Sequence, residues 1–254
     1  MNETGLVQRV SSVIRPWAWM APAMVLAGVL AGTPGCQMTA PVAGPEVRKE
    51  AAPTPVTFRQ EPEMRVRVER GASKKRVSGP ERVVARQVGT AGKTVVLRTP
   101  LTVTSGSAGL VVLDGSGERE VWPFGSELEV MTTEADPLTP VAQPLVVDGA
   151  KFPGFVTFRP LWNENPSRFD VIVTMPIEAY LPGVVTHELL PNWPRQTNEA
   201  QAVAARTYAL HERGRARAER RPFDVEATTA DQVYGSYTAR VAVDAVQATR
   251  GMIL

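Results

Sequence analysis

The sequence contains very few of the residues that form disulfides and transition-metal sites. It has a single cysteine, Cys36, which excludes an intrachain disulfide, and only two histidines, His187 and His211. One thiol and two imidazoles disfavour a cysteine–histidine metal cluster, so we expect neither a metal nor another cofactor. Any chemistry is therefore expected from carboxylate, hydroxyl and guanidinium groups.

An excess of charge of either sign is also missing. The 254 residues include 28 basic and 26 acidic ones, a net charge of +2, so no global field favours nucleic acid, and we expect no nucleic-acid partner. The densest basic run is interrupted only by Glu212 and Glu219, and we interpret it as the solvated end of a helix rather than a patch that attracts an anionic polymer. It comprises Arg213, Arg215, Arg217, Arg220 and Arg221.

No apolar run reaches the ~20 residues that a membrane-spanning helix needs. The longest, Trp17–Leu30, contains Pro22 and follows two basic residues, Arg9 and Arg15. A basic start followed by an apolar stretch of this length is typical of an export signal. We therefore predict that the protein is exported and that residues 1–36 are its signal peptide.

The only cysteine, Cys36, ends this segment in the sequence AGTPGC. It resembles the lipobox of bacterial lipoproteins, in which the cysteine carries a lipid anchor, although Thr33 and Pro34 depart from the usual pattern. The alternative is a plain secretory signal or an uncleaved anchor. Residues 37–62 are rich in Pro, Ala and charge with little apolar periodicity, which predicts a semi-extended tether. We expect a membrane-anchored lipoprotein, or else a periplasmic or wall-associated protein.

Short β-branched runs separated by Gly, Pro and Asp turns predict strands from Met64 to Val173. The expected strands are Met64–Val68, Val83–Val84, Thr94–Leu97, Leu101–Thr104, Leu110–Leu113, Leu128–Met131, Leu145–Val147, Phe155–Phe158 and Phe169–Val173.

After Thr174 the pattern becomes helical. Pro182 predicts a break between two short helices, Ile177–Leu181 and Pro182–Leu189. A long helix is expected over Gln196–Glu219, and its apolar stripe is predicted at Ala200, Val203, Ala204, Thr207 and Leu210. Residues 233–237 are expected to form a strand or loop, 241–249 a helix, and 252–254 the start of a strand. The fold class is α+β, a strand-rich body with a helical insert that carries the active site.

One segment, IEAYLPGVVTHELLPNWPRQTNEAQAVAARTY over Ile177–Tyr208, is more informative than any other. It places Glu188 beside Val184, Val185, Leu189 and Leu190, which predicts partial shielding of the carboxyl group from water and suits a general acid. The sequence of this segment resembles that of the stage II sporulation protein D family, which includes amidase enhancers. The resemblance is strong from Leu145 to Leu254 and weak from Met64, so residues 63–254 are interpreted as one domain of this type.

The resemblance implies a peptidoglycan lytic transglycosylase, exported to act on glycan strands, with Glu188 as its single acid and base. Arg206 and Tyr208 are the further candidates, for binding a substrate carboxylate and stacking on a sugar; the alternatives are a structural ion pair and a core position. Gln201 and Gln232 are candidates for sugar hydroxyls, or fill helix faces. The rival function is a non-catalytic wall-binding module that recruits or stimulates an amidase.

The sequence departs from the family in two places. Members often carry Cys and His near the QVY segment as a structural zinc site, whereas DVEATTADQVYGS (residues 224–236) has no thiol, so another kind of packing is expected there. The family also continues beyond the position of Met252–Leu254, so the chain is expected to be a fragment or a shortened member.

Overall fold

The computed structural model describes residues 61–254 except 90–91, 133–143 and 191. The chain divides into two units, 1–49 and 50–254, and all the described residues belong to the second. The predicted signal peptide, Cys36 and almost all of the predicted tether lie outside the described residues.

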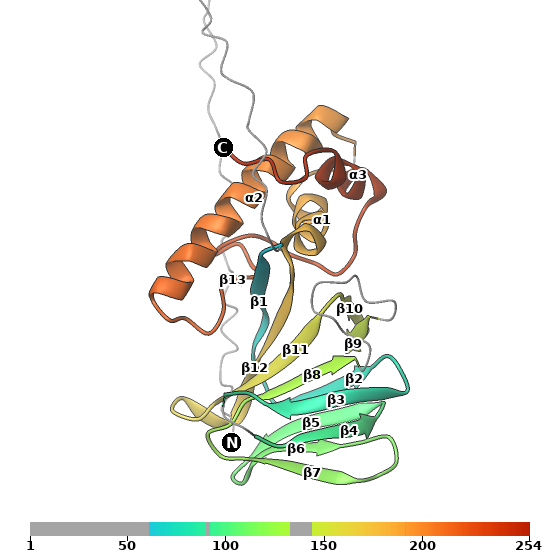
Figure 1. Ribbon diagram of the computed structural model, residues 1–254, viewed down its shortest axis with the longest axis vertical. Coiled ribbons are helices and arrows are strands. Elements are labelled where there is room, and N and C mark those ends of the chain that lie inside the picture. Colours follow the sequence, from blue (N-terminus) through green and yellow to red (C-terminus); the bar gives the residue numbers. More distant parts are fainter. Residues whose placement is uncertain (1–60, 90–91, 133–143, 191) are drawn as a thin grey trace, which may run out of the picture. The chain divides into compact units, whose positions relative to one another are not determined.

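The described strands form two sheets (Figure 1). The order in the first sheet is β13 (Val225–Glu226), β1 (Glu63–Ala72), β12 (Asn165–Pro176), β11 (Phe155–Leu161), β8 (Leu128–Thr132), β3 (Arg82–Gln87) and β4 (Thr94–Arg98). The order in the second is β10 (Ala150–Phe152), β9 (Leu145–Val147), β2 (Lys74–Ser78), β5 (Leu101–Gly106), β6 (Gly109–Leu113) and β7 (Arg119–Pro123). All described pairs are antiparallel except β1 with β13.

The strand β12 is the structural link between the sheets and the helices. It pairs with β1 on one side and β11 on the other, and residues 169–175 are all buried. An uninterrupted buried run indicates that both faces of a strand are covered, and β12 contacts β5 of the second sheet as well as α1. The chain passes from β12 straight into α1 (Ile177–Glu188), so the rigid strand fixes where this helix begins.

Three helices are described, and they pack on one another around the end of β12 (Figure 1). They are α1, α2 (Arg195–Ala218) and α3 (Arg240–Ala248). In the chain, α1 and α2 lie between β12 and β13, and β13 returns to pair with β1. The predicted α+β class, with helices inserted into a strand-rich body, is confirmed.

The predicted break at Pro182 is wrong, because α1 is one continuous helix with Pro182 inside it. A proline in a helix interior lacks an N–H donor and costs about 3 kcal/mol. Burial of Tyr180, Leu181, Val184 and Val185 around it opposes that cost, since each apolar side chain removed from water contributes roughly 1.5–3 kcal/mol. Tertiary packing therefore overrides the local signal.

The predicted apolar stripe of α2 is correct at Val203, which is buried, and at Leu210, which packs against the core, but wrong at two other positions. Ala200 and Ala204 are exposed, whereas Asn198, Arg206 and Glu212 lie on the buried face among small alanines. The expectation assumed that only apolar side chains face inward, but each of these three polar side chains has a hydrogen-bond or ion-pair partner inside the fold. Residues 233–237 form a loop, and Met252 makes only a single-residue bridge rather than the start of a strand.

Candidate active site

Glu188 is the last residue of α1, and its side chain faces solvent. Val184 and Val185, one turn earlier, are fully buried, whereas Glu188 is exposed where the helix ends. The predicted shielding of Glu188 by its apolar sequence neighbours is therefore wrong, because Glu188 lies at the exposed end of α1 and Leu190, one of those neighbours, is itself exposed. A ligand can approach this carboxylate directly.

One oxygen of Glu188 is held by the loop that follows β13. The main-chain N–H of Val233 donates to Glu188 Oε1 at 3.0 Å. No hydrogen bond to Oε2 is present among the described residues, which leaves that oxygen available to a ligand. The loop thus orients the carboxyl group without occupying both of its oxygens.

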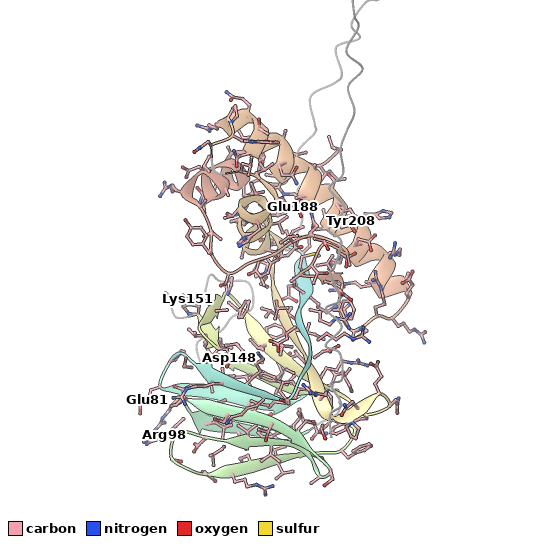
Figure 2. The ribbon with its side chains drawn as sticks, turned by 180° about the vertical axis from the view of Figure 1, so that it is seen from behind. Glu81, Arg98, Asp148, Lys151, Glu188 and Tyr208 are labelled. Atoms are coloured by element: carbon pink, nitrogen blue, oxygen red, sulfur yellow. The ribbon has the colours of Figure 1, made fainter. Side chains whose placement is uncertain are left out.

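Tyr208 belongs to the same site, although it comes from α2. Its side chain is 37% exposed, and its hydroxyl donates to Asp231 Oδ1 at 3.2 Å. Partial burial and, secondarily, the Asp231 carboxylate raise the pKa of Tyr208, so the phenol is neutral at ordinary pH. Asp231 is two residues from Val233, so one short segment holds both Tyr208 and Glu188; both are labelled in Figure 2.

The loop is pressed closely against α1. A Cβ atom at Gly183 would lie 2.5 Å from the carbonyl oxygen of Gly235, and one at Gly235 would lie 2.3 Å from the His187 ring. Gly183 is therefore required where the main chain of the loop approaches, and a side chain at position 235 would force the His187 ring to move. His187 Nδ1 lies 2.7 Å from the Gly183 carbonyl, so this ring supports the contact between helix and loop and is not placed as a base beside Glu188.

Tyr180 of α1 and Tyr234 of the loop form an apolar contact between the two segments. Their rings stack with centroids 5.2 Å apart and an interplanar angle of 24°. Burial raises the pKa of both phenols, so both remain neutral. The stack joins the middle of α1 to the residue that follows Val233.

Gln232 is buried, with 6% of its surface exposed, and its amide has protein partners. It accepts from the Tyr180 hydroxyl at 3.2 Å and donates to the Ala205 carbonyl at 3.3 Å. The predicted role of Gln232 in binding sugar hydroxyls is therefore wrong, because the amide is used to anchor the loop. Gln201 is half-buried and lies on the same face of α2 as Tyr208, two turns away, so it stays a candidate.

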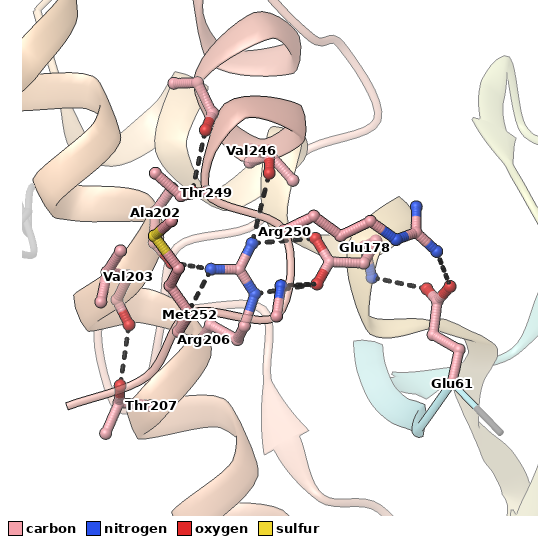
Figure 3. A network of polar contacts seen from close by, with 12 residues as sticks. Glu61, Glu178, Ala202, Val203, Arg206, Thr207, Val246, Thr249, Arg250 and Met252 are labelled. Atoms are coloured by element: carbon pink, nitrogen blue, oxygen red, sulfur yellow. Dashed lines mark hydrogen bonds and ion pairs between the residues drawn. The ribbon is translucent and has the colours of Figure 1, made fainter. Parts of the chain in front are cut away.

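Arg206 does not reach any ligand-accessible surface. Its side chain is fully buried, and its guanidinium pairs with both oxygens of Glu178 at 2.9 Å (Figure 3). It also donates to the Met252 carbonyl at 3.0 Å. The predicted substrate contact is wrong for Arg206, and the structural ion pair left open as the alternative is what the structure shows.

Sequence reasoning missed Glu178 and the network around it. The Glu178 N–H donates to Glu61 Oε1 at 3.0 Å, and Arg250 donates to the other oxygen of Glu61 at 2.5 Å (Figure 3). Glu61 thereby satisfies a free N–H at the start of α1, where an anion is favoured. An acid in the first turn of α1 and an arginine among the alanines of α2 were the two signals that could have suggested a pair.

Two acids partly offset the positive charge at the arginine-rich end of α2. Arg215 and Arg221 both pair with the buried Glu212 and with Glu219, and Arg213 donates to the Glu63 carbonyl. These contacts agree with the predicted solvated end of a helix.

No group of three or more potential metal ligands occurs in residues 61–254, apart from the undescribed positions. Within the same residues, no helix has the length and apolar character to cross a membrane.

Comparison with known proteins supports the resemblance over the helical part of the chain. Residues 165–254 match the family described as SpoIID, stage II sporulation protein, which confirms the predicted relationship. An uncharacterised protein of Brachyspira hyodysenteriae is 41% identical over 88 residues, which are 35% of this chain and 23% of that protein. The chain thus spans about a quarter of the length of this curated relative. No solved structure matches.

Proposed function

We infer a cell-wall-related function for this chain from the match of residues 165–254 to the stage II sporulation protein family. On this premise, we propose that the protein is a lytic transglycosylase that cleaves peptidoglycan glycan strands and leaves 1,6-anhydromuramic ends. Glu188 is the acid and base of the reaction. The protein acts outside the cytoplasm, where its substrate is found.

The observation that carries the proposal is the way Glu188 is presented. Its carboxyl group is accessible at the end of α1, one oxygen is fixed by the Val233 N–H, and the other is open among the described residues. A glycan lying across this end of the helix would also displace water from the carboxyl group. Loss of water favours the protonated form, which is the form that donates a proton.

A single carboxyl group is sufficient for the proposed reaction. The protonated Glu188 gives its proton to the bridging glycosidic oxygen as the bond from that oxygen to C1 of the muramic residue breaks. The carboxylate then accepts the proton of the C6 hydroxyl of the same sugar, whose oxygen bonds to C1 and closes the anhydro ring. Glu188 is protonated again, and no water is consumed, so the second carboxylate of ordinary glycosidases is not needed.

Tyr208 and Gln201 are the proposed substrate-binding residues. Tyr208 presents a neutral, partly exposed phenol, suited to stacking on a sugar face, and Gln201 lies along the same side of α2. Their separation of seven residues corresponds to roughly 10 Å along a helix, about the length of a disaccharide unit. Arg206 and Gln232 are buried beneath this surface and stabilise it through their contacts with α1 and α2.

The alternative is a non-catalytic module that binds the wall and recruits or stimulates an amidase. The exposure of Glu188 favours this alternative, because a general acid usually works in a more shielded environment. A lipid anchor on Cys36 would suit either function, since both require the protein to stay close to the wall.

Product analysis separates the two functions. Purified glycan strands are incubated with the full chain, and the ends of the products are identified by mass spectrometry. Anhydro ends, lighter than reducing ends by one water, are the expected result. Reducing ends would instead identify a hydrolase, and sedimentation with glycan without any cleavage would support the binding module.

A further inference from the structure

We propose that Asp231 is a positioning residue that fixes the segment 231–233 over α1 and α2, and thereby sets the orientation of Glu188 and Tyr208. The proposal concerns the site of the proposed function and rests on it for its catalytic consequence. The contacts of Asp231 also hold residues 224–236 in place, a stretch that has no thiol to bind a structural metal.

The two oxygens of Asp231 bind groups from two different elements. Oδ1 accepts from the Tyr208 hydroxyl of α2 at 3.2 Å, and Oδ2 accepts from the Glu226 N–H of β13 at 2.7 Å. Glu226 itself is held to β1, since its carboxylate pairs with Arg67. Asp231 therefore ties the loop to the sheet and to the long helix at once.

The contacts of Asp231 also constrain Val233, which lies two residues later in the chain and contacts Glu188. Gln232 is anchored to Tyr180 and Ala205, and Val233 then donates to Glu188. Two residues of chain span at most about 7 Å, so a shift of Asp231 is passed on to the Val233 N–H with little slack. Reacting groups must be held within about 0.5 Å of their productive geometry, which is why such support matters.

Asp231 acts through its neighbours rather than on a substrate. Both of its oxygens already accept hydrogen bonds from protein donors, unlike those of Glu188. Its removal would leave the Tyr208 hydroxyl without its acceptor and the Glu226 N–H without its side-chain partner. We therefore expect changes in geometry and a smaller loss of turnover than the loss that follows removal of the acid.

The first test uses NMR and does not depend on activity. The response measured is the shift of the Val233 amide signal on Glu188→Gln, which removes the charge of the acceptor of this amide, and the shift should be large when Asp231 is present. In Asp231→Ala this response should be lost or strongly reduced. The matched control is Asp244→Asn, which removes a carboxylate from the exposed pair with Arg240 on α3 and should leave the Val233 response unchanged.

Asp231→Asn keeps the proposal testable if Asp231→Ala does not fold. An amide still offers an oxygen to Tyr208, but its NH2 group would face the Glu226 N–H, donor against donor, so an intermediate response of Val233 is expected. A wild-type response in a folded Asp231→Asn and Asp231→Ala would overturn the proposal.

Kinetics with glycan strands provide the second test. A misplacement of about 1 Å can cost roughly 10²-fold in rate, so Asp231→Ala should lower kcat by about 10- to 100-fold. KM should rise as well, because the substrate-binding Tyr208 loses the acceptor of its hydroxyl. A loss of turnover as large as that of Glu188→Gln would overturn the positioning role in favour of a catalytic one. If the wild type cleaves nothing but the Val233 response still requires Asp231, the proposed function fails and the positioning role stands.

Discussion

At the scale of single residues, Glu188 is placed where a glycan can reach it and where the loop can orient it. Glutamine has nearly the same shape, but its amide cannot deliver a proton to a departing oxygen. General acid–base catalysis contributes about 10²–10⁴-fold, so Glu188→Gln should lose at least that much turnover. The measurement is the rate of release of anhydro-ended products.

The control is Glu164→Gln, which removes an exposed carboxylate paired only with the equally exposed Arg70 on the sheets. It should cleave glycan as the wild type does. Glu188→Gln should still bind glycan and melt near the wild-type temperature. Wild-type turnover in this variant would contradict the catalytic role and leave the wall-binding module as the better account.

The pair of Arg206 with Glu178 is the residue-scale feature on which the helical part depends most. Removing one partner of a buried pair leaves the other charge uncompensated, which costs about 3–5 kcal/mol. Arg206→Ala should therefore lower the free energy of unfolding by that amount, measured by urea denaturation. Arg206→Lys should be intermediate, because an ammonium keeps the charge but cannot bind both oxygens in a planar fork.

Arg240→Ala provides the matched control for this prediction. Arg240 is 88% exposed and pairs with Asp244 on the surface of α3, where an ion pair contributes at most about 1 kcal/mol. If Arg206→Ala were as stable as Arg240→Ala, the buried pair would not support the fold.

At the scale of elements, the turn between β6 and β7 is organised by one carboxylate. Asp114 Oδ1 accepts from the Ser116 hydroxyl at 2.7 Å and from the main chain of Ser116 and Glu118, and Oδ2 accepts from the Arg98 N–H. The Ser116 hydroxyl, followed by these main-chain donors, holds the pKa of Asp114 below its ordinary value of 3.8. The turn is thus stabilised by the charged form of Asp114.

This arrangement predicts a pH-dependent stability. Because the pKa is lower in the folded state, the unfolded chain binds more protons near pH 3–4. The stabilisation is therefore present above the ordinary pKa of 3.8 and is lost as the pH falls towards the folded value. Asp114→Asn should be about 1–3 kcal/mol less stable at pH 6, and the gap should narrow on acidification to pH 3. A gap that is the same at both pH values would contradict this assignment.

At the scale of the whole molecule, the proposed function requires the domain to stay near the wall. Cys36 lies outside the described residues, and its lipidation remains a prediction from the sequence AGTPGC. Cells fed a labelled fatty acid should incorporate the label into the wild-type protein, and Cys36→Ser should abolish it. Equal labelling of the two proteins would contradict a lipid anchor on Cys36 and favour a plain exported protein.

The sequence alone determined the α+β class, the strand-rich first half and the helix that the structure places at Arg195–Ala218. It also identified the family resemblance over the helical part, and it made Glu188 the candidate catalytic residue, which stays a prediction. These features depend on local periodicity, proline placement and short motifs, which are contained within neighbouring residues. No distant contact is needed to read them.

Only the tertiary structure decided which polar side chains face inward. Arg206 lies on the buried face of α2 because Glu178, 28 residues earlier, and Met252, 46 residues later, supply its partners. Asp231 likewise lies in the site because distant parts of the fold, Tyr208 and Glu226, supply the donors for its carboxylate. A charge can be buried only where the fold brings a partner to it, and no local pattern records where that partner will be.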